Sequence, residues 1–372
     1  DSTNQYVLYS DRPLTGGLAD LCVKSPHNNF RGRILNWPLG YFWTHARLSY
    51  EMLVRRPDVL FVPAHVLPLV HPKKSVVTIH DIGFSRQAEL YSQDKIGPAG
   101  GKLAGLIKFL VGLFTLGKFK PTVLDYHDWA VKFALKRAKA IISVSEFTKL
   151  EIMKIYQARP EKIKVIHNGF NNKLYRPIAD QEKINQILEK YGIKRPYIFY
   201  VGRLEKKKNT AKLVEAFAVM KQNQPRLNHK LVLIGSAGLG YDEIKYVIEE
   251  FNLNDEVIMP GWVPEADMPF IYNGAELFVF PSLYEGFGIP LLEAMSSGVP
   301  VAAARAAAIP EVARDAAPLF NPLNKADMAQ KMAKLLLDRQ AAQELIKRGF
   351  LRAKEFSWKK CARETLAVLE NL

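Results

Sequence analysis

The chain has 372 residues, of which 48% are hydrophobic and 24% are charged, and these proportions are typical of globular proteins. This length exceeds what a single hydrophobic core comfortably supports, so two domains are expected. The two cysteines, Cys22 and Cys361, lie far apart and lack metal-type spacing, which argues against a disulfide framework and against a zinc site. No secretory signal opens the chain and no apolar run reaches about 18 residues, so we expect a cytoplasmic protein without a membrane-spanning helix.

The formal net charge is +15, and most of it lies in the first half of the chain. Residues 1–180 hold 26 Lys and Arg against 14 Asp and Glu, whereas residues 181–372 hold 26 against 23. The first half is therefore expected to face an acidic partner, such as nucleic acid, anionic lipid or a phosphorylated substrate. The alternative is that the surplus only keeps the protein in solution.

Short apolar runs alternate with helical patterns along the chain. Because the runs are continuous rather than alternating, they suit parallel strands that are buried on both faces. The predicted strands are residues 6–9, 59–62, 75–79, 140–144 and 164–166, followed by 197–201, 230–234, 256–259, 277–280 and 299–302. The clearest helical stretches are residues 209–222, 241–251 and 326–337. This alternation predicts an α/β fold with two Rossmann-like, doubly wound domains, joined by a linker within residues 171–195.

Two stretches break the pattern. Residues 1–5 are polar, the first strand candidate ends at Ser10, and the Gly16-Gly17 pair follows it without a clear phosphate-binding glycine loop. Residues 102–120 read KLAGLIKFLVGLFTLGKFK, which is strongly apolar, is interleaved with lysines and contains no acid. Such a segment can lie in a membrane interface, and the alternative is a buried core helix whose lysines reach water at its ends.

The stretch FPSLYEGFGIPLLEAMSSGVP, at residues 280–300, carries the strongest functional pattern. A buried strand ends in a loop that holds Glu285, and a helix follows with Glu293 in its first turns. Loops at the carboxyl ends of parallel strands bind ligands, and Gly286 and Gly288 let the backbone approach one closely. Two carboxylates at this spacing can bind two parts of one elongated polar ligand. The alternative is that Glu285 is a solvated loop residue and Glu293 complements the helix dipole.

The stretch YVGRLEKKKN, at residues 200–209, has the same strand–loop–helix form. Asn209 is a suitable helix N-cap, so Arg203 and Lys208 are predicted to project over a helix N-terminus. Arginine can hold a phosphate through two parallel hydrogen bonds and lysine acts as a point charge, so together they would neutralise a diphosphate without a metal ion. The alternative is a merely basic loop, which is how the neighbouring Lys206 and Lys207 are interpreted.

Three further turns follow predicted strands. In TIHDIGF, residues 78–84, His80 and Asp81 come directly after a strand, where they can form hydrogen bonds in a cleft, although a lone histidine is more often structural. SVSEFTK at residues 143–149 and VIHNGF at residues 165–170 have the same form, and helix capping and turn chemistry alone explain them.

Taken together, these stretches resemble glycosyltransferase family 4, whose members have the GT-B fold of two Rossmann-like domains facing each other across a cleft. The resemblance lies in the order and spacing of TIHD, SVSEFTK, VIHNGF, VGRLEKKKN, PGWVPEADMPFIYNGAELFVFPS, EGFGIPLLE and SSGVPV. It runs from about Tyr6 to the end of the chain, where FSWKKCARETL resembles the family's closing helix. It implies an acceptor-side domain of residues 1–178, to which residues 357–372 return, and a nucleotide-sugar-binding domain of residues 190–356.

The resemblance also implies a retaining, metal-independent hexosyltransferase that needs no cofactor besides its nucleotide-diphosphate sugar. Arg203 and Lys208 would bind the donor diphosphate and stabilise the leaving group. Glu293 would hold the ribose hydroxyls, Glu285 would approach the transferred sugar, and His80 would touch that sugar from the opposite domain. The implied catalytic residues are Glu285, His80, Arg203 and Lys208. The implied donor-binding residues are Arg203, Lys208, Glu285, Gly286, Phe287, Gly288, Glu293 and Val263, and no residue is implied to bind a metal.

The sequence departs from the family's pattern in two places. The strand, Gly-Gly loop and helix that usually precede a stretch like residues 4–10 are predicted to be missing, so the N-terminal domain would lack its first strand. Residues 92–121 resemble an enlarged acceptor-side segment, which favours a lipid-linked or membrane-proximal acceptor.

The main functional interpretation is transfer of mannose from GDP-mannose, or of glucose from a UDP or ADP donor, to a glycan or lipid-linked glycan in polysaccharide biosynthesis. The enzyme would be cytoplasmic and peripheral on the inner face of the membrane, with residues 102–120 against an anionic surface. A catalytically impaired, membrane-associated scaffold and a nucleotide-sugar epimerase are the alternatives. A phosphorylase would need a pyridoxal lysine site, and a nucleic-acid-binding protein would need aromatic–basic stripes or a recognised module, and the sequence shows neither.

Overall fold

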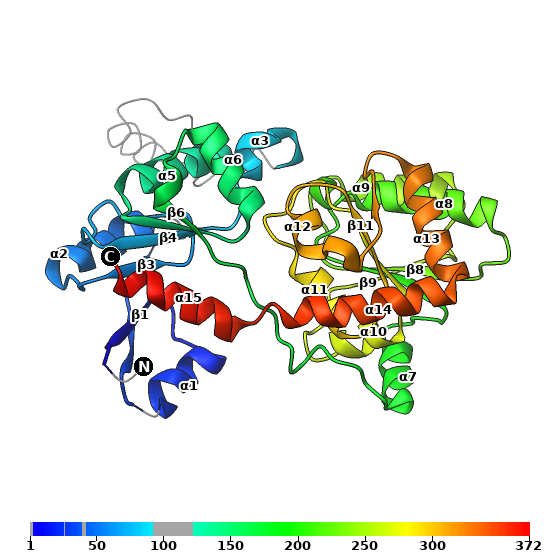
Figure 1. The fold of residues 1–372 in the computed structure, drawn as a ribbon, viewed down its shortest axis with the longest axis horizontal. Helices are drawn as coiled ribbons and strands as arrows, with labels where there is room; N and C mark the ends of the chain where they lie inside the picture. Colours follow the sequence, from blue (N-terminus) through cyan, green and yellow to red (C-terminus); the bar gives the residue numbers. More distant parts are fainter. Residues whose placement is uncertain (1–2, 26, 39–41, 92–121) are drawn as a thin grey trace. The chain divides into compact units, whose positions relative to one another are not determined.

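The computed structural model describes residues 3–25, 27–38, 42–91 and 122–372 (Figure 1). The chain divides into two compact units, one of Asp1–Ile79, Asp94–Ile141 and Asn371–Leu372, and one of His80–Gln93 and Ile142–Glu370. No helix in the described part of the chain is both long and apolar enough to cross a bilayer. The predicted membrane-surface segment at residues 102–120 and the acceptor-side segment at residues 92–121 lie outside the described residues and stay predictions.

The chain opens with strand β1 (Tyr6–Ser10), helix α1 (Gly16–Lys24) and strand β2 (Phe30–Ile34). The two strands are parallel, in a register that pairs Tyr6 with Phe30, and the rings of these residues stack with 4.6 Å between centroids. The glycine pair begins the helix, with Gly16 at a φ of +56°. The glycine pair thus follows the strand predicted at residues 6–9, and the absence of a strand, a Gly-Gly loop and a helix ahead of residues 4–10 stays a prediction.

Helix α1 escaped the sequence analysis because it carries few helix signals. The side chain of Thr15, at the N-cap position, makes no capping hydrogen bond, no acid lies in the first turn, and no residue of the helix is buried. Among the described residues, β1 and β2 pair only with each other and form a two-stranded sheet.

A four-stranded sheet has the order β3-β4-β5-β6. Its strands are β3 (Leu60–Val62), β4 (Ser75–Ile79), β5 (Ala140–Ser143) and β6 (Ile163–Val165). Every residue of β4 and β5 is buried, which explains why both read as continuous apolar runs. The longer helices along this part of the chain are α2 (Ser49–Val54), α5 (Val123–Arg137) and α6 (Glu146–Tyr156), and a short helix, α3 (Gly83–Arg86), follows β4.

The second unit contains a six-stranded sheet with the order β12-β11-β10-β7-β8-β9, in which every neighbouring pair is parallel. Its strands are β7 (Tyr197–Val201), β8 (Lys230–Ile234), β9 (Val257–Gly261), β10 (Leu277–Phe280), β11 (Val301–Ala304) and β12 (Leu319–Phe320). Read in chain order from β7, this is the strand order of a dinucleotide-binding Rossmann domain. The five predicted strands lie within two residues of β7 to β11, whereas β12 is too short to show a pattern.

Helices cover both faces of this sheet, as a doubly wound domain requires (Figure 1). On one side lie α8 (Thr210–Asn223), α9 (Tyr241–Glu250) and α13 (Lys325–Leu337), and on the other lie α7 (Gln181–Lys190), α10 (Met268–Gly274) and α14 (Arg339–Lys354). The remaining helices are α11 (Ile289–Ser296), α12 (Ile309–Ala313) and α15 (Trp358–Glu370). The sheet and these layers share one core, whose largest fully buried side chains include Tyr197, Phe199, Tyr200, Tyr272 and Phe278.

Candidate active site

The order of the six-stranded sheet reverses between β7 and β10, which are adjacent although β8 and β9 separate them in sequence. Because this pair is parallel, the chain leaves both strands at the same edge of the sheet. Residues 202–209 follow β7 and residues 281–288 follow β10, so the two loops with the strongest predicted site residues meet there. In open α/β sheets, ligands bind in the crevice at such a reversal.

Hydrogen bonds join these two loops. The backbone N–H of Leu283 donates to the carbonyl of Lys207 at 2.9 Å. Asn209 has a left-handed backbone, with a φ of +59°, and its side-chain amide donates to the carbonyls of Pro281 at 3.1 Å and Pro322 at 2.8 Å. Asn209 does precede α8, as predicted, but its side chain makes no cap, because the amide binds these carbonyls instead.

Lys208 and Glu285 are brought together at the reversal. Lys208 Nζ lies 2.6 Å from Glu285 Oε1, and the two side chains are only 20% and 13% exposed. Removing either partner of so sheltered an ion pair would leave the other charge poorly solvated. The cation assigned to the diphosphate and the carboxylate assigned to the sugar are therefore in direct contact.

Arg203 lies on the same loop as Lys208 but is far more exposed. Its Nε is 3.6 Å from Glu205 Oε2, and its side chain is 66% exposed. Gly202 has a φ of +150°, and a Cβ there would lie 2.7 Å from the Tyr200 hydroxyl oxygen, so the turn that presents Arg203 favours glycine. Among the described ion pairs, the Arg203 guanidinium has none with Glu285.

Glu293, on α11, lies among tyrosines rather than beside Lys208. The Tyr272 hydroxyl donates to Glu293 Oε2 at 2.9 Å, and the Tyr175 hydroxyl also hydrogen-bonds to this carboxylate. The two tyrosine rings meet edge to face, with 5.5 Å between centroids. Burial raises the pKa of Glu293 to about 7, and the hydrogen bonds from the tyrosines lower it by less. The two predicted acids thus have different environments, one beside a cation and one among tyrosine hydroxyls.

The raised pKa of Glu293 predicts a stability that falls as the pH rises. The native protein holds a proton on Glu293 that the unfolded chain, with a pKa near 4.5, has already released, so unfolding releases a proton and higher pH favours it. Between the two pKa values the free energy of unfolding should fall by roughly 2–3 kcal/mol. Denaturant titrations at about pH 5 and pH 8 should show this loss in the wild type and a much smaller loss in Glu293→Gln.

Glu265→Gln is the matched control for this measurement. Glu265 is exposed and acts on Glu293 only as a nearby negative charge that raises its pKa further. Its replacement should therefore change the pH dependence by a small fraction of the Glu293 effect. Equal pH slopes in the wild type and Glu293→Gln would show that Glu293 does not titrate in this range.

His80 and Asp81 reach the loop after β10 through their backbone. A Cβ on Gly286 would lie 1.7 Å from the His80 carbonyl oxygen and 3.0 Å from Asp81 Cβ, so this close approach requires glycine. On the same residue, the Gly286 carbonyl accepts a hydrogen bond from Ser145 Oγ at 2.7 Å. Ser145 also caps α6, as its sequence context predicted, by accepting from the backbone N–H of Thr148. The predicted site residue His80 therefore lies next to the loop that carries the first acid.

Two predicted donor-binding residues turn apolar side chains into the core. Val263 is 5% exposed and Phe287 is 4% exposed. Phe287 packs against the rings of His167 and Phe356, with 5.8 Å and 5.5 Å between centroids. Gly288, with a φ of +107°, stands at the start of α11. Backbone groups, rather than side chains, are what these three positions can offer a ligand.

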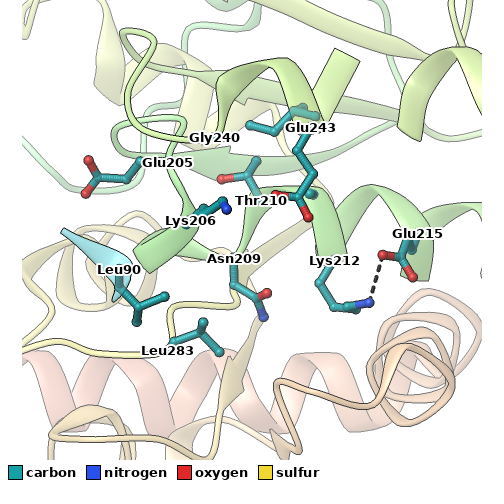
Figure 2. A pocket seen from close by; sticks show the side chains of 12 residues that line it. Leu90, Glu205, Lys206, Asn209, Thr210, Lys212, Glu215, Gly240, Glu243 and Leu283 are labelled. Atoms are coloured by element: carbon teal, nitrogen blue, oxygen red, sulfur yellow. Dashed lines mark hydrogen bonds and ion pairs between the residues drawn. The ribbon is translucent and has the colours of Figure 1, made fainter. Parts of the chain in front are cut away.

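A cavity of about 210 Å³ lies at the start of α8 (Figure 2). The residues that line it are Leu90, Glu205, Lys206, Asn209, Thr210, Ala211, Lys212, Glu215, Gly240, Glu243, Ile244 and Leu283. Its described lining includes none of the four charged side chains predicted to bind the donor. Three glutamates and two lysines line it, and Lys212 already binds Glu215 at 2.7 Å, so we assign it no ligand.

The fold and the loops at its reversal point define a class of nucleotide-binding α/β enzymes, and solved structures with the same fold exist. Sucrose-phosphate synthase from Thermosynechococcus elongatus has a TM-score of 0.72 and 19% identity, with 99% of this chain and 98% of that chain covered. HepE from Anabaena, solved in complex with UDP and glucose, has a TM-score of 0.68 and 19% identity, with 99% and 100% covered. These likenesses show the predicted architecture of two Rossmann-like domains.

Sequence comparisons establish the family. The model described as Glycosyltransferase Family 4 matches residues 21–174, and the model described as Glycosyl transferases group 1 matches residues 180–352. The O-antigen chain mannosyltransferase B of Escherichia coli is 30% identical over 264 residues, which are 70% of this chain and 68% of that protein. The chain belongs to glycosyltransferase family 4, the group 1 glycosyltransferases, and is a glycosyltransferase that uses a nucleotide sugar.

Proposed function

We propose that this protein transfers mannose from GDP-mannose to a growing or lipid-linked glycan, with retention of configuration and without a metal ion. The similarity to O-antigen chain mannosyltransferase B supports mannose over glucose. So does the serotype-specific mannosyltransferase WbdA of Escherichia coli, which is 26% identical over 227 residues, although the chain spans only 28% of that protein.

The contact between Lys208 and Glu285 is the observation that carries this proposal. Before the donor binds, each side chain neutralises the other. A donor diphosphate would compete for the Lys208 ammonium, and sugar hydroxyls would replace that ammonium on Glu285. Lys208, joined by the exposed and therefore adjustable Arg203, would then lie where negative charge develops on the departing diphosphate. Glu293 would hold the ribose hydroxyls of the same donor.

The scaffold alternative rested on the strand, Gly-Gly loop and helix that are predicted to be missing ahead of residues 4–10. β1, α1 and β2 lie at or after those residues, so they do not test that prediction. A transfer assay therefore decides between the enzyme and the scaffold.

Thermal shifts with GDP, UDP and ADP, followed by the matching sugar nucleotides, test the donor assignment. GDP and GDP-mannose should raise the melting temperature most. A transfer assay with the wild type and Glu285→Ala then separates enzyme from scaffold, and the anomeric configuration of the product, read by NMR, tests retention. A wild type without turnover, or Glu285→Ala with wild-type turnover, would contradict the proposed function.

A further inference from the structure

Lys207 is not the solvated loop lysine that its sequence suggests. Its side chain is 15% exposed, and its Nζ lies 3.9 Å from Asp81 Oδ2 and 4.7 Å from the centroid of the Tyr91 ring. Its neighbour Lys206 is exposed, and the methylene groups of its side chain lie against Gly240 (Figure 2). The ammonium of Lys207 therefore has two partners, a carboxylate and an aromatic face, and each of them favours a cation.

Asp81 connects these partners to the chain that follows β4. Its Oδ1 accepts the backbone N–H of Gly83 at 3.0 Å and the Tyr91 hydroxyl at 3.5 Å, while its Oδ2 faces Lys207. Burial raises the pKa of Tyr91, so the phenol stays neutral and keeps its proton for this donation. A Cβ on Gly83 would lie 1.9 Å from the Tyr91 hydroxyl oxygen, which shows how closely these groups pack.

This cluster adjoins the predicted sugar-binding loop. Gly286 is in contact with the backbone of His80 and with Asp81 Cβ, and Glu285 is close enough to Tyr91 to raise its pKa. Successive lysines of one 3₁₀ turn therefore bind two acids on either side of this junction, Lys208 binding Glu285 and Lys207 binding Asp81.

We propose that Lys207 is a positioning residue, which through Asp81 and Tyr91 holds His80 against the loop that binds the transferred sugar. The inference rests on the proposed function, because it assigns Lys207 to the sugar end of that site and not to the diphosphate. Loss of the ammonium would leave Asp81 without its counter-ion and release the His80 backbone from Gly286. A displacement of His80 by even about 1 Å would lower the rate of the chemical step more than it lowers nucleotide affinity.

Lys207→Met, with Lys207→Arg and Lys206→Met beside it, tests the inference. In Lys207→Met we expect kcat to fall about 10- to 100-fold, while the KM for the donor and the thermal shift with GDP stay within about two-fold of the wild type. Lys207→Arg should restore most of kcat, because arginine keeps the charge and can lie over the Tyr91 ring. Lys206→Met should behave as the wild type.

Asp81→Asn keeps the shape of the side chain, so it serves if Lys207→Met folds poorly. It should lower kcat without changing the KM for the donor. The double variant with Lys207→Met should have a kcat no lower than that of the less active single variant, because both substitutions remove the same interaction. The positioning role would be overturned by a wild-type kcat in Lys207→Met or Asp81→Asn. It would also be overturned by additive losses of kcat in the double variant, or by a loss of GDP binding equal to the loss of kcat. A wild type that neither binds GDP nor transfers sugar would instead contradict the proposed function.

Discussion

Replacing Lys208 by alanine is expected to lower kcat by roughly 30- to 1,000-fold, which corresponds to a loss of about 2–4 kcal/mol of transition-state stabilisation. The ammonium lies 2.6 Å from Glu285 Oε1 in a sheltered position, so it is held at the strand reversal before the donor arrives and has only to pass from the carboxylate to the diphosphate. Its loss would also leave the Glu285 carboxylate without a counter-ion. Steady-state kinetics measure the lost stabilisation of the leaving group and the uncompensated charge of Glu285 together. The donor in this assay is the nucleotide sugar that the thermal shifts identify.

Two comparisons separate these effects. Arg203→Ala should cost a similar amount at the leaving group, but it leaves the Lys208–Glu285 pair intact, since Arg203 binds Glu205 instead. The double variant Lys208→Ala with Glu285→Gln removes the unpaired charge, so it shows how much of the loss arises from Glu285. Unchanged kinetics in either Lys208→Ala or Arg203→Ala would contradict the assignment of these cations to the diphosphate.

The architecture was readable from the sequence because parallel strands buried on both faces leave a direct signature. The runs that became β7, β8 and β10 were placed to the residue, because each is a block of apolar side chains bounded by turn residues. Once β7 and β10 are neighbours, the meeting of Lys208 with Glu285 follows, since each side chain stands in the loop after its strand.

The surroundings of the site were not readable, because they depend on residues far apart in the chain. Tyr175 and Tyr272 come from segments long before Glu293, and neither has a local pattern that points to a carboxylate. Lys206 and Lys207 are identical in type and adjacent, yet one faces solvent and the other faces Asp81. Side-chain direction in a single 3₁₀ turn is set by what packs against it, which composition does not record.

The resemblance to a known family supplied the roles of Arg203 and Glu293. It also supplied the prediction that elements ahead of residues 4–10 are missing, which stays a prediction, since β1 is the strand that the sequence placed at residues 6–9. Helix α1, between β1 and β2, was missed because its sequence carries few helix signals.

Replacing Gly286 by alanine is expected to abolish most turnover, with a loss of at least about 100-fold. The new Cβ would lie 1.7 Å from the His80 carbonyl oxygen, a backbone atom that no side-chain rotation can move away. The opposite side of Gly286 is also occupied, because its carbonyl accepts from Ser145 Oγ at 2.7 Å. The strain must therefore separate the loop of Glu285 from His80, and the catalytic groups would part by more than the reaction tolerates.

Gly349→Ala is the matched control. That glycine lies within α14, where alanine favours the helix, and its new Cβ would meet Met295 Cγ at 3.1 Å and Met295 Cβ at 3.2 Å, contacts that a small shift of Met295 relieves. Its kcat should stay near that of the wild type. Circular dichroism of Gly286→Ala should show a folded protein, since the strain falls on a loop contact and leaves the three sheets intact. If Gly286→Ala retained full activity, His80 and the Glu285 loop would not need the close approach seen here, and neither the role of His80 nor that of Lys207 would stand.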